Sequence, residues 1–316
     1  MSGILAIGEA LGVVATTERG RFTSGGTSVF RVAGSELNVS IALARLGVPV
    51  WFAGAVGPDP VGFEIRRMLL AEGVNIDLVE LGTRPTGLLF KERYGVGQSP
   101  RVFYFRQSTS MHSWRPEDTW VDSLPVNWVH LSGITLMIDA GLRADLLRWL
   151  KLWSQRKAGR LSVDLNLRYR LANADEWRQV LESAIPLCEV VFASRSELID
   201  LWGTESGAYL IDQGILDESQ TLVVTDGAQG SWAEKSGKEL TRASAYPVKH
   251  VEDVVGAGDG FAGGVLAARY RRWSWSKSLD FGSVVGAFAV AHPGDWEGYP
   301  SWDDVISLNH GQWVER

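Results

Sequence analysis

The stretch Asp253-Val-Val-Gly-Ala-Gly-Asp259-Gly-Phe-Ala-Gly-Gly-Val-Leu266 decides the fold, because it joins a glycine-rich turn to the first turn of an apolar helix. Two glycines reach positive φ freely, so the backbone N–H groups of Gly256, Ala257 and Gly258 can converge on one point. The helix start adds partial positive charge there. The stretch therefore predicts an anion hole for phosphoryl oxygens.

A carboxylate follows this predicted anion hole directly. Asp259 lies within reach of any hydroxyl that approaches a bound phosphate, which is the position of a base for phosphoryl transfer. An acidic residue at a helix N-terminus is also a common cap, and the short motif alone leaves that alternative open. The pattern favours phosphorylation of a hydroxyl group.

The composition is that of a globular protein. The 316 residues are 45% hydrophobic and 22% charged, which is enough for an ample core in one large or two small domains. No apolar run approaches a bilayer span, and no basic region precedes the first apolar segment, so we expect a cytoplasmic protein. A net charge of −6 argues against nonspecific nucleic-acid binding. The single cysteine, Cys188, excludes an intrachain disulfide and a multi-cysteine metal site.

Short apolar segments alternate with helical segments along most of the chain. This alternation is typical of a mostly parallel sheet with helices on both faces. The predicted strands are 4–7, 50–56, 128–131, 161–164, 190–193 and 221–225. The predicted helices include 38–46, 61–71, 140–153, 176–184 and 260–272.

Two segments, 12–32 and 84–107, interrupt this alternation. They are rich in threonine, valine, aromatic residues and glycine, and they alternate as strands do. They predict either a separate small sheet or ordinary hairpin decoration.

The same stretches resemble the PfkB (ribokinase-like) carbohydrate kinases. Residues 253–259 are similar to that family's Asp-Thr-x-Gly-Ala-Gly-Asp signature, with Val254 in place of the threonine. Residues 33–47 resemble its N-terminal signature, with Ala33 in place of the first glycine. The resemblance covers nearly the whole chain. It implies one ribokinase-like catalytic domain over 1–316, with an α/β body formed by 1–11, 33–83 and 108–316 and a β-sheet lid formed by 12–32 and 84–107.

The resemblance also implies where the nucleotide binds. The turn with Thr225, Gly227 and Gly230 would meet ATP, together with the backbone of Gly256 and Gly258. Glu197 stands where the family positions hydrated Mg²⁺, although Ser194 replaces the usual asparagine three residues earlier. Because lid sheets of two subunits often meet in this family, the resemblance implies a homodimer or higher homo-oligomer.

Several stretches resemble 2-keto-3-deoxygluconate (KDG) kinases in particular. They are Gly34-Ser-Glu-Leu-Asn38, Thr86-Gly-Leu-Leu-Phe90, Tyr104-Phe-Arg106, Asp164-Leu-Asn-Leu-Arg168 and Gly294-Asp295-Trp-Glu297. In them, Arg106 and Arg168 can supply charge-assisted donors for the carboxylate of a sugar acid. The residues that the resemblance assigns to the sugar are Gly34, Asn38, Tyr104, Arg106, Arg168, Asp259 and Asp295. Leu89 departs from the tyrosine that many KDG kinases carry.

The implied activity is ATP-dependent transfer of the γ-phosphoryl group to a primary hydroxyl of KDG or a close 2-keto-3-deoxy sugar acid. Asp259 would accept the hydroxyl proton, and the three amides would stabilise the phosphoryl oxygens. A fructokinase or another neutral-sugar kinase is the nearest alternative, because a fold does not fix a substrate. A protein that senses a sugar on this scaffold without turning it over is the alternative from another class.

Overall fold

The computed structural model describes residues 2–93 and 101–308, and it is built around a nine-stranded sheet. The strand order is β13-β12-β11-β10-β9-β8-β1-β4-β5, with parallel pairing from β5 to β11 and antiparallel pairing of β12 and β13 at one edge. This confirms the predicted mostly parallel sheet. The strands are β1 (Gly3–Ile7), β4 (Val50–Val56), β5 (Asn75–Leu81), β8 (Val126–Ser132), β9 (Arg160–Asp164), β10 (Val190–Ser194), β11 (Thr221–Thr225), β12 (Ser231–Lys235) and β13 (Lys238–Ala243).

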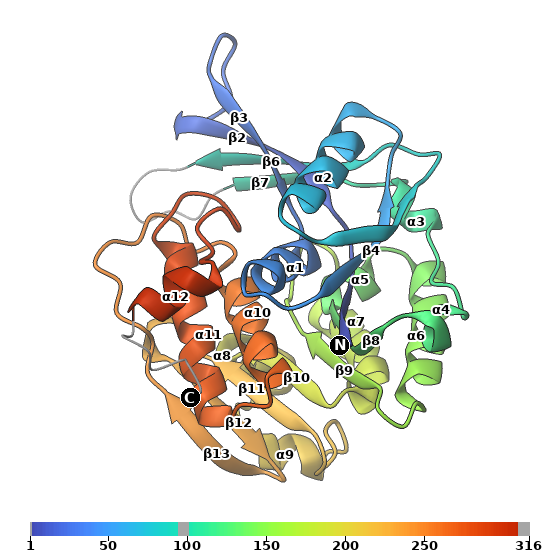
Figure 1. Ribbon diagram of the computed structural model, residues 1–316, viewed down its shortest axis with the longest axis vertical. Helices are drawn as coiled ribbons and strands as arrows, with labels where there is room; N and C mark the ends of the chain where they lie inside the picture. The colour runs from blue at the N-terminus through green and yellow to red at the C-terminus, as the bar shows by residue number, and fades with distance from the viewer. Residues whose placement is uncertain (1, 94–100, 309–316) are drawn as a thin grey trace.

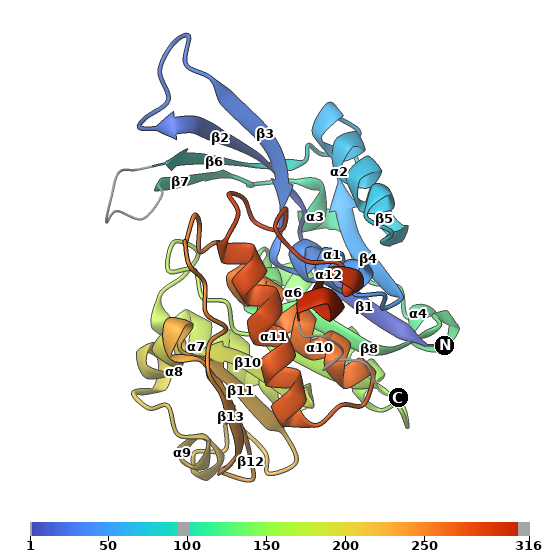
Figure 2. The ribbon, with the colours of Figure 1, turned by 60° about the vertical axis from the view of Figure 1, so that its left-hand side comes forward.

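Helices cover both faces of this sheet (Figures 1 and 2). One face carries α1 (Ser35–Arg45), α2 (Pro60–Ala71), α10 (Ala257–Tyr270), α11 (Trp275–Val290) and α12 (Trp302–Leu308). The other carries α3 (Ser110–Ser113), α4 (Trp120–Ser123), α5 (Gly133–Met137), α6 (Ala140–Ser154), α7 (Ala174–Ala184), α8 (Arg195–Trp202) and α9 (Gly207–Asp212). Single 3₁₀ turns lie at Ile185–Leu187 and Gly227–Gln229.

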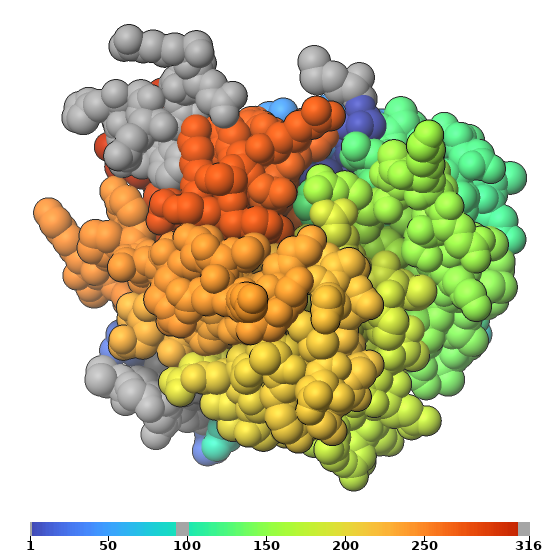
Figure 3. Space-filling model, turned by 90° about the horizontal axis from the view of Figure 1, so that it is seen from below, coloured from blue at the N-terminus to red at the C-terminus, as the bar shows by residue number. Residues whose placement is uncertain are grey.

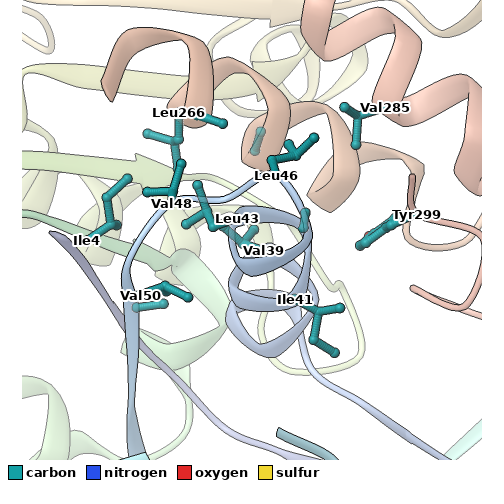
Figure 4. Packing of buried hydrophobic residues seen from close by; sticks show 14 of the residues in the cluster. Ile4, Val39, Ile41, Leu43, Leu46, Val48, Val50, Leu266, Val285 and Tyr299 are labelled. Carbon is teal, nitrogen blue, oxygen red and sulfur yellow. The ribbon is translucent and has the colours of Figure 1, made fainter. Parts of the chain in front are cut away.

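The core has two layers because alternate strand residues point to opposite faces of the sheet. Ile4 of β1 joins the layer under α1 and α10, whereas Leu5 joins the layer under α6 and α7. In the first layer, Leu43 of α1 and Leu46, the residue that follows this helix, lie close to Leu266 of α10 (Figure 4). Burial of these apolar side chains holds α1 and α10 side by side.

A second sheet of four strands forms the predicted lid. Its order is β3-β2-β6-β7, with β2 and β6 parallel to each other. The strands are β2 (Leu11–Arg19), β3 (Ser28–Ala33), β6 (Gly87–Arg93) and β7 (Arg101–Phe105). Of the predicted insertion 84–107, residues 94–100 lie outside the described part of the chain. Both ribbon views show this sheet at one end of the molecule, beyond the carboxyl end of β1 (Figures 1 and 2).

The opposite end of the molecule lies at the bottom of Figure 1. Seen from that side, the surface is formed mainly by segments from the middle and the C-terminal third of the chain (Figure 3). No helix within residues 2–93 and 101–308 combines the length and the apolar character that a bilayer crossing requires.

Candidate functional site

A cavity of about 500 Å³ lies between the lid and the carboxyl ends of the central strands. Asp164, Ser194 and Thr225 end β9, β10 and β11, and all three line it. Glu9 lines it from the segment between β1 and β2. Ligands of open parallel sheets bind at this edge, because the loops there converge around a crevice. The fold therefore places the predicted site residues around one cavity.

The glycine turn before α10 has one left-handed residue. Gly256 has φ 77°, and an added Cβ would lie 1.7 Å from the Asp295 carbonyl oxygen, so only glycine fits there. Gly258 is helical instead, and an added Cβ at that position would meet nothing within 4 Å. Neither backbone conformation nor packing within the described chain requires a glycine at 258. The open space above its backbone is therefore available to a ligand.

Two amides of this turn are free to bind an anion. The Ala257 N–H donates a long 3.4 Å hydrogen bond to the Val254 carbonyl oxygen. The N–H groups of Gly256 and Gly258 make no hydrogen bond with the residues that the structure describes. Val254, which stands in place of the usual threonine, is 68% exposed and lines the cavity. The turn can therefore hold an anion without the missing hydroxyl.

Asp259 lies in the first turn of α10, as predicted, and its carboxylate is held on both oxygens. Ser35 Oγ donates to Oδ1 at 2.8 Å, and Asn38 Nδ2 donates to Oδ2 at 2.7 Å. Burial raises the pKa of Asp259 to about 6, while the Asn38 and Ser35 hydrogen bonds and the Arg168 charge act in the opposite direction. The carboxylate is therefore mostly ionised at neutral pH, yet a better proton acceptor than an ordinary aspartate.

The close packing of α10 on α1 brings these donors to Asp259. An added Cβ at Gly263 would lie 2.6 Å from the Ala42 Cβ, so a larger residue would push the two helices apart. On the far side of α1, Glu36 Oε1 accepts hydrogen bonds from Thr135 Oγ1 at 2.6 Å and from the N–H and Oγ of Ser132 at 2.6 and 2.8 Å. These contacts fix the start of α1, and with it Ser35 and Asn38.

Three cationic side chains line the cavity, and two of them have carboxylate partners. Arg106 Nη2 lies 2.6 Å from Glu9 Oε2, an ion pair whose angle does not suit a hydrogen bond. Lys91 Nζ lies 2.7 Å from Asp253 Oδ2. The exposed Arg168 donates to the Leu167 carbonyl oxygen at 2.8 Å. Within the described residues, no carboxylate lies within 4.0 Å of the Arg168 guanidinium, so its charge is available to a ligand.

The other residues predicted to bind the sugar also lie at the cavity. Gly34, at the start of α1, lines it, and so does Tyr104, whose ring centroid is 5.8 Å from the Arg106 guanidinium carbon. Asp295 lines it as well, and burial raises its pKa to about 7 while Lys91 opposes that shift. Asn38 uses its Nδ2 on Asp259, and its buried Oδ1 has no partner in the described chain. Asn38 therefore positions the candidate base in this structure.

The predicted nucleotide residues are only partly brought to this cavity. Thr225 lines it, whereas Gly227 and Gly230 are not among its lining residues. Gly230 has φ 103°, and an added Cβ would lie 2.1 Å from the Ala243 carbonyl oxygen, so this glycine is required by the packing of β13. Gly227, at φ 51°, opens the short turn after β11.

Glu197, predicted to position Mg²⁺, lines the cavity but has structural partners. Its Oε1 accepts from the Leu167 N–H and its Oε2 from the Ser194 N–H, both at 2.7 Å. Ser194 and Glu197 form a reciprocal capping box at the start of α8. Among the described residues, no group of three or more histidine, cysteine or acidic side chains could hold a metal ion. A Mg²⁺ ion at this site would depend mainly on substrate phosphates and water.

Sequence reasoning missed several residues at the site. Ser35 and Asn166 form a chain, in which Asn166 Nδ2 donates to Ser35 Oγ at 2.7 Å. Asn166 adopts φ 46°, a left-handed conformation that asparagine tolerates better than most residues. Burial, Glu197 and Asp259 raise the pKa of Asp164 well above its usual range. A signal was present, because Asn166 and Asp164 both lie in the Asp-x-Asn-x-Arg stretch.

Comparison with known proteins agrees with this geometry. Residues 1–302 match the pfkB family carbohydrate kinase profile. The chain is 27% identical over 313 residues to a 2-dehydro-3-deoxygluconokinase of Bacillus subtilis, which covers 98% of this chain and 95% of the relative. It is also 27% identical over 283 residues to a fructokinase of Vibrio alginolyticus, which covers 86% of this chain and 90% of that relative.

A similar fold occurs in a putative ribokinase II of Escherichia coli, whose crystal structure was determined in complex with ATP and Mg²⁺. The TM-score is 0.83 at 23% identity, and the alignment covers 98% of this chain and 99% of that one. The α/β body with a four-stranded lid is therefore the ribokinase-like fold.

Proposed function

We propose that this protein, which belongs to the pfkB family of carbohydrate kinases, phosphorylates a primary hydroxyl of KDG or of a close 2-keto-3-deoxy sugar acid. The observation that carries the proposal is the guanidinium of Arg168, which has no carboxylate partner among the described residues and lines the cavity that also holds Asp259. A sugar acid brings a permanent carboxylate, which a free guanidinium binds with charge-assisted hydrogen bonds. A neutral sugar has no carboxylate that could bind this guanidinium.

The lid side of the cavity supports a 3-deoxy substrate. Leu11, Val13, Leu89 and Val102 line it with apolar side chains. A methylene group of the substrate can lie against such a surface at no cost, whereas a hydroxyl would lose its hydrogen bonds with water. Leu89, which replaces a polar tyrosine of many KDG kinases, extends this apolar surface.

The proton transfer in this proposal falls to Asp259. Its carboxylate, held by Ser35 and Asn38, accepts the proton of the attacking hydroxyl while the oxygen–phosphorus bond forms and the bond to ADP breaks. The free amides of Gly256 and Gly258 stabilise the negative charge on the phosphoryl oxygens. The lid over the sugar excludes water, which would otherwise take the phosphoryl group.

The nucleotide would extend from this turn along α11. Gly286 of α11 packs next to Ala257, where an added Cβ would lie 3.2 Å from the Ala257 carbonyl oxygen. Ser283, about one helical turn earlier, lines a cavity of about 420 Å³ with Tyr246 and Lys277. This second cavity offers room for the base of ATP. The Mg²⁺ that such a nucleotide carries would neutralise phosphate charge, and in this proposal its water shell would meet Glu197, which lines the first cavity.

A panel of sugars with ATP and Mg²⁺ tests the proposal through ADP release. We expect KDG or its galactose-derived epimer to have the highest kcat/KM among KDG, the epimer, fructose, ribose and adenosine. The Arg168→Ala variant should lose the preference for the acidic sugar, and Arg168→Lys should keep part of it, because it retains the charge without the planar fork. An unchanged preference in Arg168→Ala would refute the assignment of the carboxylate.

A fructokinase is the second candidate, since the fructokinase relative is as similar in sequence as the deoxygluconokinase. A higher kcat/KM for fructose than for KDG would establish it. Saturable sugar binding without ADP release would instead favour the non-catalytic sensor.

We also propose that two copies of the chain associate through the outer face of the lid. Tyr104 of β7 faces the cavity, so its neighbours Phe103 and Phe105 face outward, where they are 44% and 62% exposed. Phe30 of β3 is 43% exposed, and Phe90 packs edge-on against Phe105. Such an aromatic sheet face favours an identical partner. A Phe105→Lys variant should sediment as a monomer; a wild-type monomer at micromolar concentration would refute the proposal.

A further inference from the structure

Lys91 joins the lid to the phosphate-binding turn. Its Nζ lies 2.7 Å from Asp253 Oδ2, and the two side chains are only 9% and 14% exposed. The other oxygen of Asp253 accepts a hydrogen bond from the Val255 N–H at 3.2 Å, at the start of the turn that leads to Gly256. One carboxylate therefore holds the lid with one oxygen and the phosphate-binding turn with the other.

Lys91 also belongs to the surface that a sugar would touch. It lies in β6 two residues after Leu89, so both side chains point to the same face of the lid, and both line the 500 Å³ cavity. A smaller cavity of about 220 Å³ continues past Lys91, between the lid and residues 293–295. A shift of β6 over the sugar thus moves the ammonium group that Asp253 binds.

Loss of either partner of this ion pair would be costly. The pair is largely shielded from solvent, so salt screens it little, and loss of the ammonium would leave Asp253 with a buried, uncompensated charge. Asp295 lines the same two cavities, and the Lys91 charge acts on it too. The Lys91 ammonium group therefore faces two carboxylates of the body from a strand of the lid.

We propose that Lys91 is a positioning residue that couples the sugar-contacting face of the lid to the phosphate-binding turn, so that sugar and nucleotide each raise the protein's affinity for the other. The inference rests on the proposed function, because it takes the two ligands to be a sugar and ATP. Linkage requires the effect to be equal in both directions.

Calorimetric titration of the β,γ-imido analogue of ATP with Mg²⁺, with and without saturating KDG, measures this coupling. In the wild type, the sugar should lower the Kd of the analogue by at least about fivefold. In Lys91→Met the same sugar should change that Kd by less than about twofold. Lys91→Arg should restore most of the coupling, because a guanidinium can also pair with Asp253.

Arg31 offers a matched control on the same lid. Its Nη1 donates to the Pro293 carbonyl oxygen at 2.6 Å, and its Nε lies 3.4 Å from Glu297. Arg31→Met therefore removes a lid-to-body contact that does not touch Asp253, and it should leave the coupling intact. Full coupling in Lys91→Met, or an equal loss in Arg31→Met, would overturn the proposal.

Two further arms separate this proposal from the proposed function. If the ADP-release panel shows turnover of a sugar other than KDG, the same titrations use that sugar, and Lys91 is judged on it. Without any sugar, hydrogen exchange at the Val255 amide, which donates to Asp253, should be faster in Lys91→Met than in the wild type and unchanged in Arg31→Met. Equal exchange in all three proteins, or a wild type without coupling, would count against Lys91 alone.

Discussion

Replacement of Asp259 by asparagine tests the proton acceptor while keeping the shape of the site. The carboxylate now accepts hydrogen bonds from Ser35 and from Asn38. An amide nitrogen facing Asn38 Nδ2 would place two donors together, but rotation of the Asn38 amide would present its Oδ1, which has no partner in the described chain. The variant should therefore fold and bind both substrates with nearly unchanged KM.

The expected loss falls on kcat. A general base contributes about 10²- to 10⁴-fold to the rate. At about 1.36 kcal/mol for each factor of ten, that range corresponds to roughly 3 to 5 kcal/mol of transition-state stabilisation. In the wild type, a pKa of about 6 leaves Asp259 about 90% ionised at pH 7 and about 10% ionised at pH 5. The kcat/KM of the wild type should thus fall about tenfold per pH unit below pH 6.

Steady-state ADP release between pH 5 and pH 8 measures both effects. Asp259→Asn should show the reduced kcat and no acid limb near pH 6, because no carboxylate remains to protonate at that position. Thermal unfolding of the variant at pH 7 controls for folding. A variant that turns over within threefold of the wild type, or that keeps the acid limb, would refute the role of Asp259 as the base.

Three further predictions follow from the surroundings of this carboxylate. Ser35→Ala removes a hydrogen bond of about 1 kcal/mol to the ionised form of Asp259, so the acid limb of kcat/KM should move up by about 0.7 pH unit; an unmoved limb would contradict the assigned bond. Gly258→Ala adds a methyl group where the protein leaves open space, so we expect an unchanged melting temperature but a raised KM for ATP. An unchanged KM for ATP would show that no ligand lies against residue 258. The pKa of Asp295 is raised to about 7, so its ionisation at higher pH adds negative charge beside an acidic sugar. At pH values above 7, the KM for KDG should therefore increase in the wild type and stay constant in Asp295→Asn.

Much of the fold could be predicted from the sequence because its strands are apolar. All six predicted strands are present, and the predicted strand 50–56 coincides with β4. The prediction missed β5 and β13, which are the two edge strands of the sheet, and β12, which lies next to β13; all three contain charged residues. Ser236 and Gly237 between β12 and β13 both have positive φ, as a two-residue hairpin turn requires, but serine is an uncommon residue there and hid the signal.

Helix starts were predicted less well, because they depend on backbone contacts that a hydrophobic pattern does not contain. The helix predicted from residue 260 begins at Ala257, and the one predicted from residue 38 begins at Ser35. In both helices, residues that precede the predicted start belong to the site. Gly34 and Gly256 precede these turns in backbone conformations with positive φ, and each packs against a carbonyl oxygen of a distant segment.

The partners of the charged residues were the part of the site that sequence could not reveal. Arg106 and Arg168 look equivalent in the sequence, as arginines near a predicted strand end. In the fold, Glu9 follows β1 and lies beside Arg106, whereas within the described residues no carboxylate reaches Arg168. The pairing depends on which strands are neighbours. Only the tertiary structure therefore distinguishes an arginine that pairs with a carboxylate of the protein from one that can pair with a ligand.

The same pairing bears on how an acidic protein would bind the two anionic substrates of the proposed reaction at one point. Among the described residues, three cationic side chains and six carboxyl groups line the cavity. The carboxyl groups belong to Glu9, Glu36, Asp164, Glu197, Asp259 and Asp295. The count overstates the negative charge, because burial raises the pKa of Glu36, Asp164 and Asp295, which favours their neutral forms, and Glu9 is paired with Arg106. Glu197, in turn, has backbone donors on both oxygens. The charge left to act on a ligand is therefore concentrated at Asp259, Arg168 and the amides of the phosphate-binding turn, which are the groups that the proposed reaction needs.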